Sequence, residues 1–147
     1  MRDKATLLYE WRQIRLELQK DFSKKQLQET MDWFTSLDPV THGFNYDDIY
    51  TWPDIWEYIN EGWYTRSGNG LGCYYTVDFA CPDRDNQLWL VHDMLHGDMY
   101  LVTYCDGYIL NRANGQVCEY EKHKKDLHIM EKFDKMKIVS TLKDRKE

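Results

Sequence analysis

The chain has 147 residues, a formal net charge of −6 and an aromatic content of 15%, with six Trp and eleven Tyr. This length is typical of one domain whose core needs no disulfide or structural metal. Such an aromatic content argues against disorder. An acidic chain is repelled by phosphate backbones, so we do not expect general nucleic-acid binding.

The first residues are charged from the second position onward and lack the apolar core of a secretion signal. No apolar run approaches the roughly 20 residues that a membrane-spanning helix needs. We therefore expect a cytoplasmic protein without membrane contact. The cysteines are then expected to be reduced thiols, at Cys73, Cys81, Cys105 and Cys118.

Two amphipathic helices are predicted in residues 1–38. Apolar residues recur there at helical spacing, after a candidate N-cap at Asp3. Ser23 followed by Gln26 predicts a capping box that begins the second helix. Pro39 predicts its end, because the residue before a proline avoids helical dihedral angles. Together the two segments are expected to form a helical hairpin.

A shorter helix is predicted after Trp52, since Pro53 suits a first helical turn. Residues 67–72 are rich in glycine and are expected to form a tight loop without a phosphate-binding motif. Residues 73–80 fit both the alternation of a strand and one face of a helix. Both interpretations of that segment stay open.

An antiparallel sheet is predicted over residues 87–120. Asp106-Gly107 and Asn114-Gly115 are typical of two-residue type I′ turns between strands. The N-terminal helices are expected to cover one face of this sheet.

The sequence thus predicts an α+β fold in one domain spanning residues 1–147. Its expected parts are a helical hairpin (1–38), a short helix with the sheet (52–121) and a C-terminal helix (122–142). The late lysines are expected on a solvated helix face. They are Lys122, Lys124, Lys125, Lys132, Lys135 and Lys137.

His92-Asp-Met-Leu-His96 has the spacing of two zinc ligands on a helix. The preceding residues favour a strand, however, in which two such histidines do not converge, and no third ligand follows at a familiar spacing. The cysteines form no C-x-x-C pair. We therefore expect no metal and no cofactor.

Cys73 would open a helix if residues 73–80 are helical, and the positive end of a helix dipole favours a thiolate. His96 is then a candidate base, and Asn111 or Asp106 a candidate to orient it. This set predicts a catalytic triad of Cys73, His96 and Asn111. The other three cysteines are expected to be small core residues.

Short segments of the chain occur in an order that resembles small tailed-phage proteins of transglutaminase-like (papain-like cysteine peptidase) type. They are Trp52-Pro-Asp-Ile-Trp-Glu-Tyr-Ile59, Tyr64, Gly70-Leu-Gly-Cys-Tyr-Tyr-Thr76, Leu88-Trp-Leu-Val91 and Gly107-Tyr-Ile-Leu-Asn111. The resemblance implies a helix over residues 67–80 packed on an antiparallel sheet. It places a nucleophilic cysteine near Thr65 and a histidine near Met99, so it also implies degenerate catalytic positions, unless Cys73 and His96 serve in shifted places.

We therefore expect a small intracellular protein-interaction or regulatory protein, phage-encoded and acting on a host protein, rather than an enzyme. Aromatic residues are the candidate partner contacts. They are Trp52, Trp56, Trp63 and Tyr64. The alternative is a thiol-dependent hydrolase or acyltransferase of transglutaminase-like type that uses Cys73, His96 and Asn111.

Overall fold

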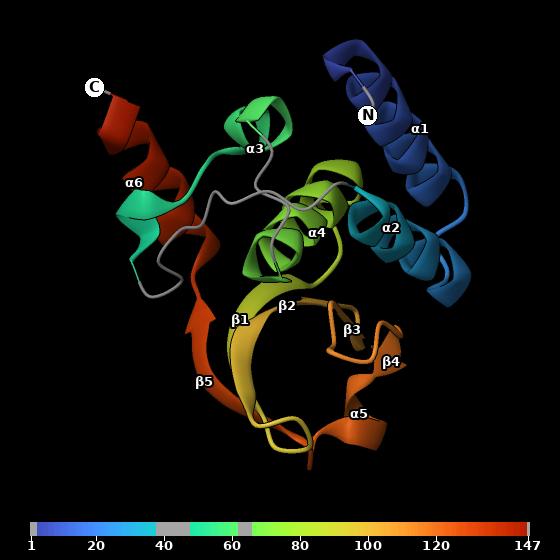
Figure 1. Cartoon of the computed structure of the whole chain (residues 1–147), viewed down its shortest axis with the longest axis vertical. Coiled ribbons are helices and arrows are strands. Elements are labelled where there is room, and N and C mark those ends of the chain that lie inside the picture. The colour runs from blue at the N-terminus through green and yellow to red at the C-terminus, as the bar shows by residue number, and fades with distance from the viewer. Residues whose placement is uncertain (1–2, 38–47, 62–65, 147) are drawn as a thin grey trace.

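The computed structural model describes residues 3–37, 48–61 and 66–146 and shows an α+β fold (Figure 1). Its elements in chain order are α1 (Lys4–Lys20), α2 (Lys24–Ser36), the 3₁₀ turn η1 (Ile49–Thr51), α3 (Ile55–Glu61), α4 (Arg66–Ala80), β1 (Asn86–Asp93), β2 (Asp98–Cys105), β3 (Tyr108–Leu110), β4 (Cys118–Glu119), α5 (Tyr120–His123), β5 (Leu127–Phe133) and α6 (Lys135–Lys146). None of the helices in these ranges combines the length and apolar character needed to cross a membrane.

The predicted N-terminal helices α1 and α2 are confirmed, and the capping residues explain where they begin. The Asp3 carboxylate accepts a hydrogen bond from the Thr6 N–H at 2.8 Å. The Ser23 hydroxyl accepts one from the Gln26 N–H at 3.2 Å. Each side chain satisfies an N–H that the first helical turn leaves without a partner.

Residues 67–72 form no loop, because they belong to the helix α4, which also includes residues 73–80. A Cβ atom at Gly70 would lie 2.4 Å from the Leu101 carbonyl oxygen, and one at Gly72 would lie 2.6 Å from the Phe34 ring. Glycine therefore lets the α4 backbone approach β2 on one side and α2 on the other. The helix over residues 67–80 implied by the family resemblance is present.

The five strands form one antiparallel sheet in the order β4-β3-β2-β1-β5. Figure 1 shows the sheet curved beneath α4, with α1 and α2 beyond that helix. Helix α4 lies against β2 and β1, whereas α1 and α2 pack mainly on α4, and α2 also contacts β3. The cover on the sheet is thus chiefly α4, and the hairpin adds to it, since its residues share a core cluster with Cys105 and Leu110.

The first predicted turn is confirmed, and the second differs. Asp106 and Gly107 have φ angles of 47° and 94°, and Cys105 pairs with Tyr108 across them. At the second turn Gly115 has a φ of 76°, but Asn114 is not among the described residues with positive φ. The Gly115 N–H instead donates to the Arg112 carbonyl at 3.0 Å, within a wider loop between β3 and β4.

The C-terminal helix is present but begins later than predicted. Residues 127–133, assigned to a helix over 122–142, form β5, which pairs with β1 and contains a bulge opposite Leu90 and Val91. The edge of β1 has backbone N–H and C=O groups that β5 can pair with. Hydrogen bonds to these groups stabilise a strand here more than the spacing of the apolar residues stabilises a helix. Helix α6 then places Ile138 in the core, beside η1.

Candidate functional site

Cys73 lies in the middle of α4 rather than at its N-terminus. Its side chain has no exposed surface and belongs to the core that α1, α2 and α4 share. Burial raises the pKa of the Cys73 thiol well above its usual value. The neutral thiol is therefore favoured over the nucleophilic thiolate.

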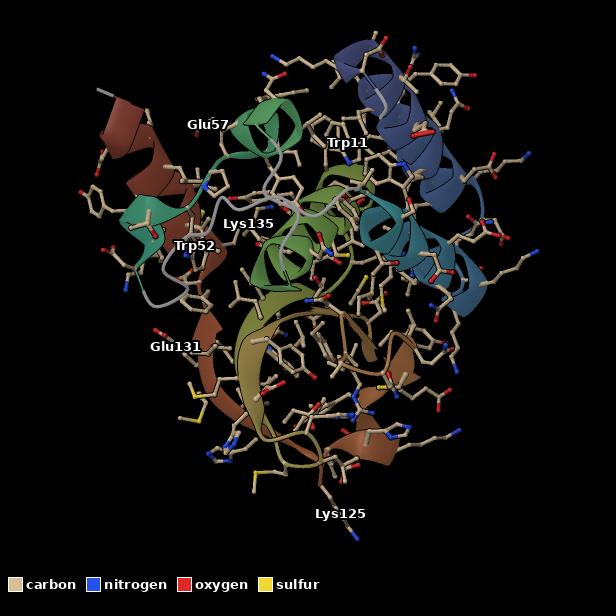
Figure 2. All side chains as sticks on the ribbon, viewed as in Figure 1. Trp11, Trp52, Glu57, Lys125, Glu131 and Lys135 are labelled. Atoms are coloured by element: carbon tan, nitrogen blue, oxygen red, sulfur yellow. The ribbon has the colours of Figure 1, made fainter. Side chains whose placement is uncertain are left out.

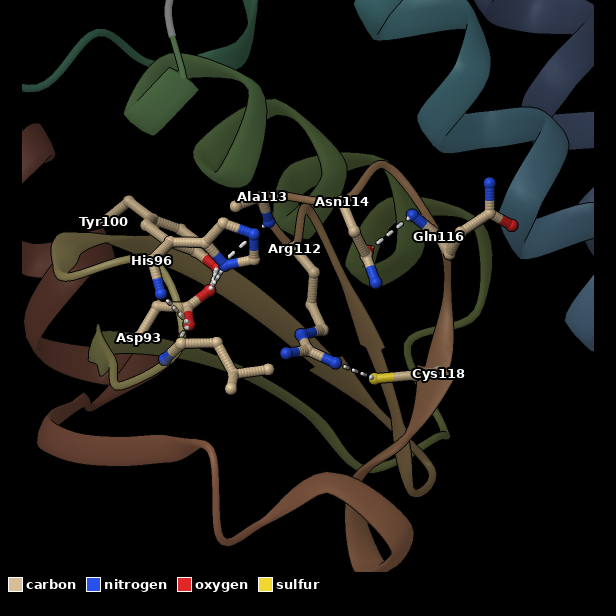
Figure 3. Close-up of polar contacts among 9 residues, drawn as sticks. Asp93, His96, Tyr100, Arg112, Ala113, Asn114, Gln116 and Cys118 are labelled. Atoms are coloured by element: carbon tan, nitrogen blue, oxygen red, sulfur yellow. Dashed lines mark hydrogen bonds and ion pairs between the residues drawn. The ribbon is translucent and has the colours of Figure 1, made fainter.

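His96 lies in the turn between β1 and β2, two residues before β2 begins at Asp98. Its Nδ1 is 3.0 Å from Oδ2 of Asp93, and its side chain is 43% exposed. The same carboxylate accepts hydrogen bonds from the backbone N–H groups of Leu95 at 3.0 Å and His96 at 3.2 Å (Figure 3). His96 is thus oriented by Asp93, a residue that the sequence did not single out as its partner.

Asn111 follows β3 and is buried with a φ of 75°. Its Nδ2 donates to the Leu101 carbonyl at 2.8 Å, and a Cβ atom at Gly70 would lie 3.0 Å from that nitrogen. Asn111 therefore lies between β2 and α4. Among the hydrogen bonds of the described residues, none joins Cys73, His96 and Asn111 to one another, and the triad stays a prediction.

The two catalytic positions implied by the family resemblance have different outcomes. Thr65 lies outside the described residues. Met99 is the second residue of β2, the strand near whose first residues the resemblance implies a histidine. Met99 stands directly opposite His92 on β1.

Asp93 and Tyr100 form a buried polar connection that sequence reasoning missed. The Tyr100 hydroxyl donates to Asp93 Oδ2 at 2.6 Å and accepts the Ala113 N–H at 3.0 Å (Figure 3). Burial opposes ionisation of Asp93, but the hydrogen bonds from Tyr100, His96 and Leu95 outweigh it and lower the pKa of that carboxyl. Burial, then the bond to Asp93, raises the pKa of Tyr100 to about 12.

Arg112 is a second missed residue, and it is only 4% exposed. Its Nη1 donates to the Cys118 sulfur at 3.8 Å, and its Nε has no partner among the described residues (Figure 3). A buried guanidinium normally pairs with a carboxylate. Neither the sequence around Arg112 nor its spacing signals that this cation is buried.

The aromatic residues predicted to contact a partner separate in the structure. Trp52 is fully buried and packs edge-on against Phe133, with ring centroids 4.9 Å apart. Trp56 is 51% exposed. Trp63 and Tyr64 lie outside the described residues.

Trp56 belongs to a surface that we call the aromatic surface, composed of Trp11, Arg15, Trp56 and Phe79. The Trp56 and Phe79 rings each lie 5.7 Å from the buried Trp11 ring, and Phe79 is 49% exposed. The Arg15 guanidinium carbon stands 4.1 Å from the Trp11 centroid and 4.7 Å from that of Phe79. Figure 2 shows Trp11 between α1 and α3.

The described residues contain no group of three or more His, Cys, Asp or Glu side chains that could hold a metal ion. His92 and His96 do not lie on a common helix, since His92 is in β1 and His96 in the following turn. The spacing that resembles a zinc motif therefore does not place the two histidines on one helix face.

No family model matches the sequence, and a comparison with curated proteins finds no match. Among solved structures, Legionella pneumophila LapG matches with a TM-score of 0.69 and 16% sequence identity, over 92% of this chain and 78% of LapG. LapG has a transglutaminase-like cysteine protease-type fold. At this identity the likeness is one of fold, and it supports a transglutaminase-like fold for this chain.

Proposed function

We propose that this protein binds a polypeptide partner through the aromatic surface, on a transglutaminase-like fold. The observation that carries the proposal is the half exposure of Trp56 and Phe79, whose rings both contact the Trp11 ring. Trp and Arg dominate the residues that contribute most to protein–protein binding. Partner contact would remove both exposed rings from water.

The chemistry of Arg15 indicates what the partner supplies. Its Nε is buried and has no hydrogen-bond partner among the described residues. Burial, and then repulsion from Arg12, lowers the pKa of the Arg15 guanidinium. A carboxylate at the edge of the guanidinium would offset the charge of both arginines. We therefore infer a partner segment that combines apolar side chains with Asp or Glu.

A displayed library of random peptides tests this proposal. Peptides selected on the protein are expected to be enriched in acidic and apolar residues. Trp56→Ala and Arg15→Met should each weaken their binding by about tenfold or more. Met136→Ala is the matched control, because Met136 is 71% exposed on α6, which lies on the opposite side of the molecule from α1 in Figure 1.

Unfolding temperatures of the three variants distinguish lost contacts from lost structure. Selected peptides that bind the folded Trp56→Ala and Arg15→Met variants as tightly as the parent would refute the proposal.

We further propose, from the sequence resemblance, that the natural partner is a host protein of a phage-infected cell.

A second candidate function is a thiol-dependent hydrolase or acyltransferase that uses Cys73, His96 and Asn111. The fold likeness to LapG favours it. Carboxymethylation of Cys73 by iodoacetamide near neutral pH, followed by peptide mass spectrometry, discriminates between the candidates. A native rate above that of the urea-unfolded chain would support thiol catalysis, whereas a rate well below it is expected for a buried neutral thiol.

A further inference from the structure

An open pocket of about 700 Å³ lies beside β1, α5 and β5. Its lining includes His92 from β1, His128 from β5, and Lys124 and Lys125 from the segment between α5 and β5. One histidine of the paired-histidine motif and two of the late lysines therefore meet in one place. Figure 2 shows Lys125 at the end of the molecule opposite Trp11, so this pocket is separate from the aromatic surface.

The two pocket histidines are neighbours. His92 and His128 are directly opposite each other in the antiparallel pair of β1 and β5. Side chains in such a pair have Cβ atoms about 4.5–5.5 Å apart on the same face. Both imidazoles can therefore contact a single small ligand.

The charges around the pocket favour an anion. No Asp or Glu is among its described lining residues. The nearby Glu121 carboxylate pairs with Lys124 at 2.9 Å, and the Asp93 carboxylate is occupied by His96 and Tyr100. Lys125 forms no ion pair within the described part of the chain. Within the described lining, two lysines therefore meet two histidines and no carboxylate, in a chain of net charge −6.

We propose that this pocket binds a small multivalent anion, an organic phosphate or a polycarboxylate. Lys125, His92 and His128 would contact its charged groups, because ammonium and imidazole N–H groups donate to such oxygens. Leu127 and the Tyr120 ring supply an apolar wall for the rest of the molecule. The volume lies within the range of about 300–1,000 Å³ that is typical of small-ligand sites. The two lysines disfavour a metal cation at the same histidines.

NMR titration of the full chain with pyrophosphate and with citrate tests the proposal. The imidazole C–H signals of His92 and His128 should shift, whereas His96, bound to Asp93, serves as an internal reference. Lys125→Gln and His128→Gln should each weaken the binding by about tenfold. Lys143→Gln is the matched control, since Lys143 is an exposed lysine of α6.

The outcomes are distinct. Tighter binding of pyrophosphate assigns the pocket to phosphates, and tighter binding of citrate assigns it to carboxylates. An absence of His92 and His128 shifts with both probes at millimolar concentration overturns the proposal. The proposal is also overturned if Zn²⁺ shifts the His92 and His128 signals and neither anion does. A Lys143→Gln variant that weakens binding as much as Lys125→Gln would overturn it as well.

Discussion

Gly107 has a φ of 94°, and a Cβ atom added there would meet no atom within 4 Å. Any cost of a larger residue at this position therefore comes from the backbone alone. Gly107→Val should lower the free energy of unfolding by more than about 1 kcal/mol, because a β-branched residue is strained at positive φ. Urea denaturation measures this change.

Gly107→Asn is the control for that prediction, since Asn tolerates positive φ better than Val does. Its loss of stability should be the smaller of the two. Equal stability of the Val variant and the parent would mean that the turn does not constrain its backbone as described.

Asp93 makes the stability of the protein depend on acid pH. Because its folded-state pKa is lowered, its contribution to stability is present above about pH 4, where the unfolded carboxyl ionises. That contribution is lost as the pH falls through the folded-state value. Asp93→Asn should destabilise the protein by about 1–3 kcal/mol at pH 7. Urea denaturation at a series of pH values should show this difference shrinking below pH 4, and a constant difference would contradict the assignment.

Helix α3 begins with a reciprocal pair of hydrogen bonds. The Glu57 N–H donates to Asp54 Oδ1 at 2.8 Å, and the Asp54 N–H donates to Glu57 Oε1 at 3.0 Å. Because α3 carries Trp56, this cap also orients part of the aromatic surface. Asp54→Ala should lower the unfolding free energy by about 1 kcal/mol.

Thermal unfolding with binding of the selected peptides checks the role of the α3 cap. Asp54→Ala should reduce both stability and affinity. Glu57→Ala is the matched control, because the Asp54 side chain still caps the helix and the loss should be smaller. An unchanged melting temperature in Asp54→Ala would show that tertiary packing alone fixes α3.

Elements whose boundaries depend on local chemistry were predictable from the sequence. The caps at Asp3 and Ser23 and the turn at Asp106-Gly107 each involve residues only a few positions apart. The residue pattern alone did not predict α4, although the family resemblance implied it, because the reason for Gly70 is the Leu101 carbonyl, which is distant in the sequence. Strand β5 was missed for the same physical reason, since its backbone partners are in β1.

The candidate site was predictable only in part. The sequence drew attention to Trp56, and the structure leaves that side chain half exposed. It gave no sign that Arg15 stacks on two rings, or that His92 and Lys125 line one pocket. Those relationships depend on how α1, α4 and β5 pack, and no local pattern encodes that packing.

At the scale of the whole molecule, α4 belongs to two parts of the core. Cys73 and Val77 pack with α1 and α2, whereas Leu71 and Tyr74 pack with the sheet. If α4 leaves one of these two parts of the core, the apolar residues of the other part are exposed to water as well. We therefore expect the helical hairpin and the sheet to unfold together.

Coincident urea transitions in far-ultraviolet circular dichroism and in tryptophan fluorescence would support this expectation. Trp11 reports on the helical part and Trp89 on the sheet. Two resolved transitions would instead mean that the hairpin separates from an intact sheet.

The close approach of α4 to β2 has a consequence for the order of folding. Gly68, Gly70 and Gly72 each lower the helix propensity of α4 by about 1 kcal/mol relative to Ala, so this segment is a poor helix before it contacts the sheet. The hairpin of β1 and β2 involves contacts that are closer in sequence and should form in the folding transition state. Val77→Ala should therefore accelerate unfolding while leaving the refolding rate nearly unchanged in stopped-flow measurements. The helix at the centre of the structure would then be among the last elements to become ordered.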